Sequence, residues 1–505
     1  MSALAFPTAR TAVPFLSALV LGSLTTTAVR AQELGDEWGT GGAEDAYYRI
    51  VDLDVPEELQ LEAGSMCLMP GDRLAVGTRR GEILIVDGVF DEVPDPRYSV
   101  FATGLDEVFG LGYRDGSFWV TQQTEVSRIT DTDGDGRADR FDTLSDVWGF
   151  EHYHEFSWGS APDENGDVWV VLGLSASYRY EADYRGWAFR ITPDGETIPI
   201  ASGVRSAGGV APNEHGVMFY VESQGPWNGA CSLKHLKPGS FVGHPIAFGG
   251  YDLPLGKQLG ERPLEPENRS RLIDEADRIE QLVPYAVIFP YRRMGQSITA
   301  FRVDESDGRF GPFAGQLFVS DFSLSLVMRA TTEQVNGVWQ GACYPFREGF
   351  GTGLLAMAIS PNGHLVTGGT NRGWPVRGNR QYLLQRVDWT GVTPFDVERV
   401  SIEPDGFTLT FTKPVDRELA GDPTRYQVGT FRHYYQQFYG SPEIDRSEPE
   451  IRGVTVADDG RSVRLRLDLR RGYVHELTLA ADHRAADGTP LLHRHAYYTV
   501  NEIPR

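Results

Sequence analysis

The sequence predicts an all-β protein, a six-bladed β-propeller followed by an immunoglobulin-like or fibronectin-like β-sandwich. Three observations lead to this prediction. A turn-and-strand phrase recurs six times along the chain. The 57 glycines and 30 prolines among 505 residues are typical of a turn-rich β protein, and strictly alternating segments follow residue 391.

Each copy of the phrase joins a Gly, Asn or Asp turn to a short run of β-branched and aromatic residues. Asn-Gly and Asp-Gly favour tight hairpins because these residues tolerate positive φ. The copies cover residues 71–77, 115–120, 165–170, 215–221, 314–319 and 362–367. Most of them recur at intervals of about 45 to 50 residues, the period of a four-stranded propeller blade. Six copies predict six blades, and an ordinary sandwich or irregular β domain is the alternative.

The phrases place the propeller at residues 47–391, with an insertion at about 240–300 that carries the helical pattern of 269–282. Residues 392–505 contain strictly alternating segments, which are typical of half-buried strands in a sandwich. Within this second domain, residues 426–439 are rich in Tyr, Arg and His. We expect that stretch to pack against the propeller, or else to contact sugar.

The first residues of the chain resemble a secretory signal. Arg10 is the only charge before an apolar stretch, and Val29-Arg30-Ala31 ends the segment with small residues at the two positions that determine cleavage, Val29 and Ala31. This pattern predicts a signal peptide over residues 1–31 and a periplasmic or secreted protein. The apolar stretch is shorter than the roughly 18 residues that span a bilayer, so no membrane span is expected. Residues 32–46, rich in Gly, Glu and Asp, are predicted to be a disordered lead-in.

The formal net charge of −23 argues against general nucleic-acid binding, because an acidic surface repels phosphate backbones. A carbohydrate or a small polar alcohol is a compatible ligand. Cys67, Cys231 and Cys343 lie far apart in the sequence, with no zinc-type spacing. We expect three buried free thiols, and one disulfide with one free thiol is the alternative.

An acidic run between two predicted strands has the spacing of a calcium loop. Carboxylates stand at its first, third, fifth, ninth and twelfth positions, and Gly136 at the sixth allows a sharp turn. Position twelve is Asp rather than the usual bidentate Glu. A solvated hairpin tip is the alternative. The predicted metal ligands are Asp131, Asp133, Asp135, Arg137, Asp139 and Asp142.

Two further groups of residues suggest chemistry at one end of the propeller channel. His152 and His154 lie two residues apart, so a strand would point both to one face, where a neutral imidazole is a suitable general base. Arg205 ends one strand, and the loop Gln224-Gly225-Pro226 follows the next. A fixed cation beside exposed carbonyls suits an anionic ligand held through a bridging cation.

These residues resemble the soluble glucose/sorbosone dehydrogenases that use pyrroloquinoline quinone, over about residues 47–390. The acidic run and residues 370–374 further resemble a poorly characterised branch of that superfamily. The resemblance implies that the carbonyls of Gly225 and Pro226 bind a calcium that also holds the quinone. It implies that Gln224 and Arg205 contact the quinone and that His154, or His152, is the catalytic base.

The sequence departs from the family pattern at three places. Ser206 stands where the family has Asn, residues 229–231 lack its acidic residue, and residues 353–357 lack its Arg-x-Arg. Arg292, Arg293 and Arg372 are the cations that would compensate, in a pocket expected to be neutral or locally positive.

The leading hypothesis is an exported sugar or alcohol oxidoreductase, with a redox partner left open. The alternatives are a uronate lyase that uses the same pocket and a non-catalytic carbohydrate-binding propeller.

Overall fold

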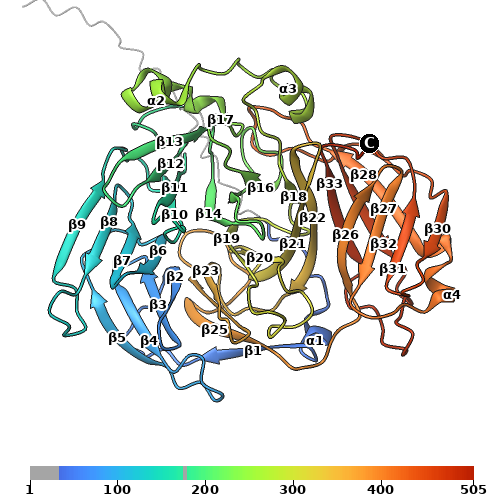
Figure 1. Ribbon diagram of the computed structural model, residues 1–505, viewed down its shortest axis with the longest axis horizontal. Coiled ribbons are helices and arrows are strands. Elements are labelled where there is room, and N and C mark those ends of the chain that lie inside the picture. The colour runs from blue at the N-terminus through green and yellow to red at the C-terminus, as the bar shows by residue number, and fades with distance from the viewer. Residues whose placement is uncertain (1–32, 175–178) are drawn as a thin grey trace, which may run out of the picture. The chain divides into compact units, whose positions relative to one another are not determined.

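The computed structural model describes residues 33–174 and 179–505, and this part of the chain is nearly all β (Figure 1). The predicted signal peptide, residues 1–31, lies outside the described residues. None of the described helices is long and apolar enough to cross a membrane.

Six antiparallel four-stranded units make up most of the fold. In five of them the strands follow chain order. The first three units consist of β2 (Ala63–Met69), β3 (Arg73–Thr78), β4 (Ile83–Asp87) and β5 (Arg97–Ala102); β6 (Gly110–Arg114), β7 (Ser117–Thr121), β8 (Val126–Thr130) and β9 (Arg140–Ser145); and β10 (Ser157–Gly159), β11 (Val168–Leu172), β12 (Trp187–Ile191) and β13 (Thr197–Ser202).

The sixth unit joins the beginning of the fold to a strand more than 300 residues later in the chain. The fourth and fifth units consist of β14 (Ala207–Pro212), β15 (Met218–Glu222), β16 (Cys231–His235) and β18 (Val287–Phe289), and of β19 (Ile298–Val303), β20 (Leu317–Asp321), β21 (Leu326–Val335) and β22 (Val338–Arg347). The sixth consists of β23 (Leu354–Ile359), β24 (His364–Thr370), β25 (Tyr382–Trp389) and β1 (Tyr48–Leu53). β1 pairs with β25 from Tyr48 opposite Trp389 to Leu53 opposite Leu384.

The first strands of the six units contact one another in cyclic order, β2 to β6, β10, β14, β19, β23 and back to β2 (Figure 1). This is a propeller-like arrangement. Each turn phrase of the sequence lies between the first and second strands of one unit, where the Gly residues at the tips adopt positive φ, as at Gly116 and Gly363. The second strands that follow are almost fully buried, which explains their β-branched and aromatic composition.

Helices are confined largely to the segment between β16 and β18. It contains a short strand, β17 (Ser240–Phe241), and three helices, η1 (Pro245–Asp252), α2 (Pro254–Leu259) and α3 (Leu272–Arg278). The helix predicted over residues 269–282 is therefore shorter than expected. Arg269 has a φ of 66° and the N-cap Arg271 is extended, so the helix cannot begin before Leu272.

The C-terminal region consists of two packed sheets. One contains β26 (Val397–Glu403), β27 (Gly406–Phe411), β30 (Gly453–Val456) and β31 (Ser462–Arg466). The other contains β28 (Tyr426–Arg432), β29 (Ile444–Ser447), β32 (Tyr473–Leu479) and β33 (His495–Val500), and α4 (Arg417–Ala420) and η2 (Pro423–Arg425) lie in the connections. Alternate residues of β27 enter the shared core, as the sequence pattern predicts.

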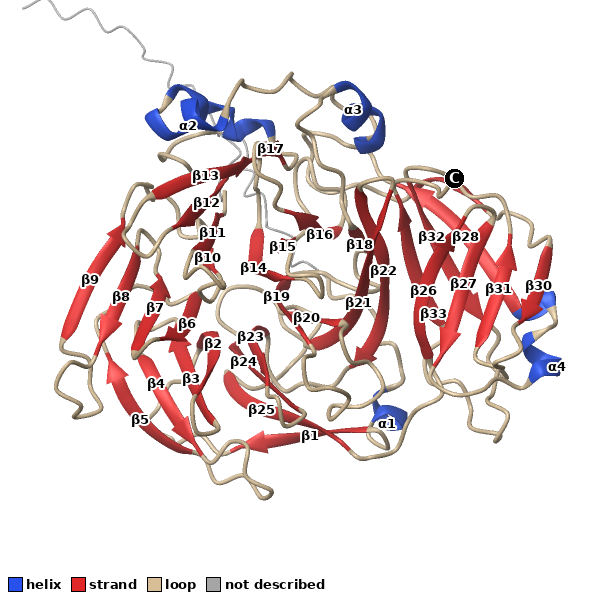
Figure 2. Ribbon diagram, viewed as in Figure 1, coloured by secondary structure: helices blue, strands red, loops and turns tan. Residues whose placement is uncertain are grey.

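This region is less separate than the sequence suggested. β33 pairs with β22, with Gly341 opposite Thr499 and Cys343 opposite Tyr497, so one eight-stranded sheet runs from the fifth unit into the C-terminal region (Figure 2). The long strand β22 serves both cores, because Ala342 and Tyr344 join the C-terminal core while Cys343 faces the core of the fourth and fifth units.

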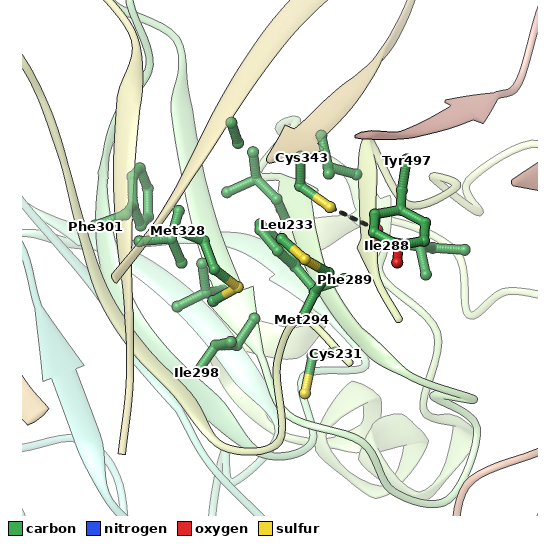
Figure 3. Close-up of a cluster of buried hydrophobic side chains, with 14 of the residues drawn as sticks. Cys231, Leu233, Ile288, Phe289, Met294, Ile298, Phe301, Met328, Cys343 and Tyr497 are labelled. Atoms are coloured by element: carbon green, nitrogen blue, oxygen red, sulfur yellow. Dashed lines mark hydrogen bonds between the residues drawn. The ribbon is translucent and has the colours of Figure 1, made fainter. Parts of the chain in front are cut away.

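The three cysteines are free. Cys231 and Cys343 are fully buried among Leu233, Phe289 and Met294 (Figure 3), and the Cys343 thiol donates a hydrogen bond to the Ile288 carbonyl at 3.5 Å. Cys67 is partly exposed by surface area, yet burial of its thiol raises the pKa to about 12. These thiols therefore serve packing, as expected from the sequence.

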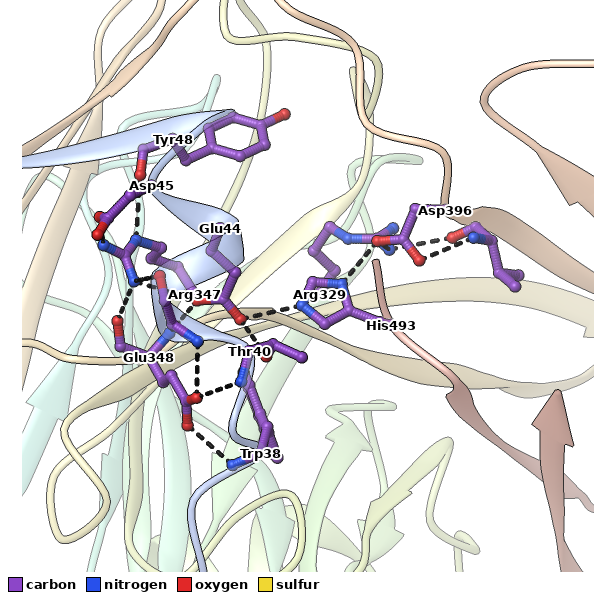
Figure 4. A network of polar contacts seen from close by, with 12 residues as sticks. Trp38, Thr40, Glu44, Asp45, Tyr48, Arg329, Arg347, Glu348, Asp396 and His493 are labelled. Atoms are coloured by element: carbon purple, nitrogen blue, oxygen red, sulfur yellow. Dashed lines mark hydrogen bonds and ion pairs between the residues drawn. The ribbon is translucent and has the colours of Figure 1, made fainter. Parts of the chain in front are cut away.

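The segment before β1 differs from the predicted disordered lead-in. Trp38, Thr40 and Gly41 donate backbone hydrogen bonds to the Glu348 carboxylate, and Glu44 of α1 (Gly41–Glu44) is fully buried (Figure 4). Composition alone does not predict that this segment is ordered. The groups that neutralise Glu44 are Arg347 of β22 and His493, near the other end of the sequence.

Candidate functional site

The candidate site lies at one end of the ring of first strands. In an antiparallel meander, the connection between the second and third strands lies at the same end as the connection to the next unit. His154, Arg205, the Gln224–Pro226 loop and Arg372 all lie in such connections. The structure therefore gathers them at one end of the ring, together with Arg79.

The two histidines do not share a strand face as predicted. Residues 151–155 form a turn, in which the Glu155 amide donates to the His152 carbonyl at 3.0 Å. The side chains consequently diverge. His152 forms an ion pair with Glu181, whereas His154 stacks on the indole of Trp374 with ring centroids 5.1 Å apart.

The surroundings of the two imidazoles have opposite effects on protonation. Partial burial lowers the pKa of His154 below its ordinary value of 6.5, and the nearby cations Arg79 and Arg205 lower it further. The hydrogen bond that the His152 ring donates to the Glu181 carboxylate raises the pKa of His152. At neutral pH, His154 is therefore the histidine able to accept a proton.

A network of two arginines and two glutamates lies beside His154. Arg79 donates to the Glu107 carboxylate at 2.9 Å, to the Tyr153 hydroxyl at 3.2 Å and to the Arg372 carbonyl at 3.1 Å. Arg372 in turn lies 3.3 Å from both Glu107 and Glu62. The two cations and two carboxylates balance, so this part of the site carries no net charge, and Arg372 is engaged by protein carboxylates.

Arg79 and Glu107 were missed by the sequence analysis. The position of Arg79 in its repeat could have identified it. Arg79 follows the second strand of its unit, β3, immediately, as Gln122 follows β7 and Ser223 follows β15. In a meander, the residue after the second strand begins a connection at the site end. The residue directly after the second strand of each unit is therefore a candidate site residue, whatever its type.

Arg205 lies on a buried charged cluster at the same end of the ring. The fully buried carboxylate of Glu222 accepts from the backbone amides of Arg205 and Ser206 and forms an ion pair with buried Lys234. The Arg205 guanidinium donates to the Gln224 carbonyl at 3.1 Å. A Cβ on Gly225 would come within 2.5 Å of this guanidinium, so only glycine permits the approach.

A loop of the C-terminal sandwich, residues 433–441, covers the Gln224–Gly229 loop. The Gly440 amide donates to the Gly225 carbonyl at 3.0 Å, and the Trp227 amide donates to the Gln436 carbonyl at 2.7 Å. Pro226 and Tyr439 form a β-bridge, and the Tyr439 ring lies 5.1 Å from the Arg205 guanidinium. We call residues 433–441 the covering loop.

This arrangement does not fit the quinone–calcium pair that the resemblance implies. A calcium ion needs oxygen ligands, whereas the Gly225 carbonyl already accepts two N–H groups, from Gly440 at 3.0 Å and from Asn228 at 3.1 Å, which use both of its lone pairs. Gln224 in turn donates to the Gly229 carbonyl at 2.9 Å. Two groups of the predicted cofactor cradle, the Gly225 carbonyl and the Gln224 side-chain amide, are therefore used by contacts within the chain.

The other two predicted cations, Arg292 and Arg293, lie in the connection from β18 to β19, at the same end of the ring. Arg293 forms ion pairs with Glu443 and Glu476 of the sandwich. Arg292 donates to the Leu34 carbonyl at 2.7 Å. Neither is among the groups that shift the His154 pKa.

The acidic run forms the hairpin tip between β8 and β9, away from this end of the ring. Ligand oxygens of Asp131, Asp133 and Asp135 lie within 4.8 Å of one another. The remaining predicted ligands are used differently. Asp139 accepts from Thr132, and Asp142 pairs with Arg128 and Arg140. Arg137 is exposed, and its amide donates to Asp135 at 2.8 Å.

The fold and site thus define a propeller-like all-β protein with a histidine-, arginine- and aromatic-lined end. Residues 83–244 match a family model described as a domain of unknown function (DUF7133). No curated protein matches the chain.

Among solved structures, the protein is similar to a putative oxidoreductase (glucose dehydrogenase) from Thermus thermophilus. The identity is 17% over 67% of this chain and 99% of that one, with a TM-score of 0.46. It is also similar to the pyrroloquinoline-quinone-bound aldose sugar dehydrogenase of Streptomyces coelicolor, at 15% identity over 68% and 99% of the two chains and a TM-score of 0.46. Quinone-dependent sugar dehydrogenases, which the sequence motifs resemble, are thus among the proteins to which this structure is similar.

Proposed function

We propose that this end of the ring binds a carbohydrate and that His154 is the general base of a reaction on it. The observation that carries the proposal is the His154 imidazole stacked on Trp374, a side chain that is 47% exposed. Burial and the nearby cations Arg79 and Arg205 lower the pKa of this imidazole, which favours its neutral form. Sugar rings present apolar C–H faces to aromatic side chains, while their hydroxyls bond to polar neighbours. Arg205 and the Tyr153 hydroxyl are polar groups of this kind.

The reaction that we propose first is oxidation of a sugar or related alcohol. His154 takes the hydroxyl proton while the adjacent carbon loses a hydride to an acceptor. The support is that His154, Arg205 and the Gln224–Pro226 loop lie at the same end of the ring, as the resemblance requires. Because the loop does not fit a quinone with calcium, we derive no step through that cofactor. The proposal requires an external redox partner instead, a diffusible two-electron acceptor of the quinone or dye class, which takes up the hydride and is reduced as the alcohol becomes a carbonyl.

A second candidate is β-elimination from a uronate. It is favoured because the Gly225 carbonyl and the Gln224 amide bond within the chain, and elimination needs no hydride acceptor bound there. His154 takes the proton α to the carboxylate, the electron pair forms a carbon–carbon double bond, and the glycosidic C–O bond breaks. The Tyr153 hydroxyl, on a ring 4.7 Å from that of His154, protonates the leaving oxygen. Arg205 stabilises the anionic intermediate.

One experiment separates the two reactions. The purified protein is incubated with aldoses and a reducible dye in one arm, and with polyuronides in the other, where new double bonds absorb ultraviolet light. His154→Ala should lower turnover in the active arm by roughly 100- to 10,000-fold. His152→Ala, two residues away and paired with Glu181, is the matched control and should retain activity.

Binding of a sugar with no turnover in either arm would leave a non-catalytic carbohydrate-binding protein and overturn the role of His154. Absence of sugar binding would overturn the proposal as a whole. Equal losses in His154→Ala and His152→Ala would show that the base was assigned to the wrong residue.

We also propose the architecture and export that the sequence predicted. The six four-stranded units are the blades of one propeller over about residues 47–391, and the pairing of β1 with β25 closes the propeller. Residues 392–505 are an immunoglobulin-like sandwich. The support is the cyclic contact order of the first strands and the two-sheet core of the C-terminal region. Export to the periplasm or medium rests on the first 31 residues and is tested by N-terminal sequencing of the secreted protein.

We further propose that the acidic hairpin tip binds calcium in a structural role. The support is the convergence of Asp131, Asp133 and Asp135, whose charges repel one another without a cation. Terbium luminescence should report the site, and Asp133→Asn should abolish it without affecting turnover. A terbium signal unchanged in Asp133→Asn would contradict the assignment.

A further inference from the structure

We infer that the sandwich supplies a second sugar subsite to this end of the ring, in which Tyr439 stacks on a glycosyl unit beside the one at His154. The inference rests on the proposed function and deepens it, because it makes an oligosaccharide the substrate rather than a monosaccharide. Three observations support it: where the exposed aromatic rings lie, how the covering loop is held, and what links Tyr439 to His154.

The exposed aromatic side chains concentrate at the site end. Among the described residues six such side chains are strongly exposed, and only Phe141, on β9, lies elsewhere. The other five are Phe150, Tyr153, Trp374, Phe438 and Tyr439. Exposed apolar side chains scattered singly need no explanation, but a local concentration marks a binding surface.

The covering loop is held rigidly at its base and exposed at its tip. Tyr435 is 1% exposed, and its ring packs against that of Trp227 with centroids 4.9 Å apart. Gly440 has a φ of 65°, and a Cβ there would meet the Gln224 side chain at 2.5 Å. Between these anchors, Phe438 and Tyr439 are 55% and 54% exposed.

A loop that served only to pack the sandwich against the propeller would bury the aromatic rings at its tip, because burial of an aromatic ring is its main contribution to stability. This loop instead buries Tyr435 and presents Tyr439 in a fixed position. Preorganised aromatic rings bind ligands at low entropic cost. The tip therefore has the properties of a binding element.

Arg205 connects the two ends of the proposed binding surface. Its guanidinium lies 5.1 Å from the Tyr439 ring and is also one of the two cations that lower the His154 pKa. His154 in turn stacks on Trp374. Two exposed aromatic rings thus flank one base and one cation, an arrangement suited to more than one sugar unit of the same chain.

The test is calorimetric binding of four probes: glucose, cellotriose, galacturonate and trigalacturonate. The first two report a neutral ligand and the last two an acidic one. For whichever class binds, Tyr439→Ala should weaken the trisaccharide roughly 5- to 10-fold and the monosaccharide less than twofold. Tyr439→Phe should retain affinity, because the ring is kept. Phe141→Ala, an equally exposed ring away from the site, is the matched control and should change neither.

Each outcome decides the inference. Equal weakening of both sugars in Tyr439→Ala, or equal affinity of the wild-type protein for both, overturns the second subsite while sugar binding stands. If the wild-type protein binds none of the four probes, the proposed function fails and the inference with it. Thermal melting of each variant identifies unfolding. If Tyr439→Ala melts early, the comparison of Tyr439→Phe with Tyr439→Leu replaces it, with the loss expected only in the leucine variant.

Discussion

Two histidines in this protein have charged neighbours of opposite sign, and the contrast shows how one side chain serves two purposes. His154 lies half-buried at the site end, where burial, Arg79 and Arg205 all lower its pKa. His493 is fully buried between Asp396 at 2.7 Å and Glu44 at 3.0 Å (Figure 4). Burial opposes its charge, yet the two carboxylates outweigh burial and raise its pKa to about 9.

The first histidine is therefore neutral and available, and the second is charged and structural. His493 connects the segment before β1, through Glu44, with Asp396 at the start of the sandwich. Arg347 adds a second cation on Glu44 at 3.1 Å. The sign of the neighbouring charge, rather than the depth of burial alone, decides whether a histidine is a neutral candidate base or a charged residue that holds two segments together.

The largest expected effect on stability comes from removing the buried cation. His493→Ala leaves the carboxylates of Asp396 and Glu44 facing each other and should cost about 3 to 5 kcal/mol of unfolding free energy. Chemical denaturation measures this change. His154→Ala, at a half-buried position where the ring stacks on Trp374, is the comparison and should stay within about 1 kcal/mol of the wild-type protein.

If His154→Ala proved as destabilising as His493→Ala, the distinction between His154 as a candidate base and His493 as a structural residue would be wrong. If His493→Ala left stability unchanged, the charged cluster of Figure 4 would contribute nothing to the fold.

The second expected effect is the pH dependence of this stabilisation. The folded-state pKa of His493, about 9, lies above the ordinary value of 6.5. Its contribution is therefore fully present below pH 6.5, decreases as pH rises through about 9, and amounts to about 3 kcal/mol. His493 lowers the pKa of Glu44 against the effect of burial. The stabilisation that ionised Glu44 provides is therefore present above pH 4.5, the ordinary pKa of a glutamate, and is lost as pH falls below that value.

Melting temperatures of the wild-type protein and His493→Ala across pH measure this linkage. The difference between them should be largest at about pH 5 to 6.5, should shrink as pH rises from 6.5 to about 9, and should level off above that. A constant difference over the whole range would mean that His493 acts through packing rather than charge.

The smallest expected effect is a shift in the pH profile of activity. Arg205→Gln removes one of the cations that lower the His154 pKa, so the acidic limb of kcat/KM should move to higher pH, by up to about one unit. Asp142→Asn, on β9 away from the site, is the control. An unchanged limb would show that Arg205 does not act on the base, whatever its effect on KM.

The local elements of this fold could be predicted from the sequence because each depends on neighbouring residues. The six turn phrases coincide with the turns between first and second strands, and alternation in residues 407–411 coincides with the buried face of β27. The helix after Arg269 was overestimated, since a positive φ at that residue overrides the apolar pattern. The His152 and His154 pair was assigned to a strand that is in fact a turn.

By itself, the sequence determined the β class, the positions of the hairpins, and the residue types that meet at one end of the ring, because turn chemistry and alternation are local. Only the tertiary structure decided that Glu44 meets His493, that Arg79 donates to Tyr153, and that the covering loop pairs with the Gln224–Pro226 loop. Those contacts join residues separated by 449, 74 and more than 200 positions. No local pattern encodes such pairings, since they depend on how whole sheets close and pack.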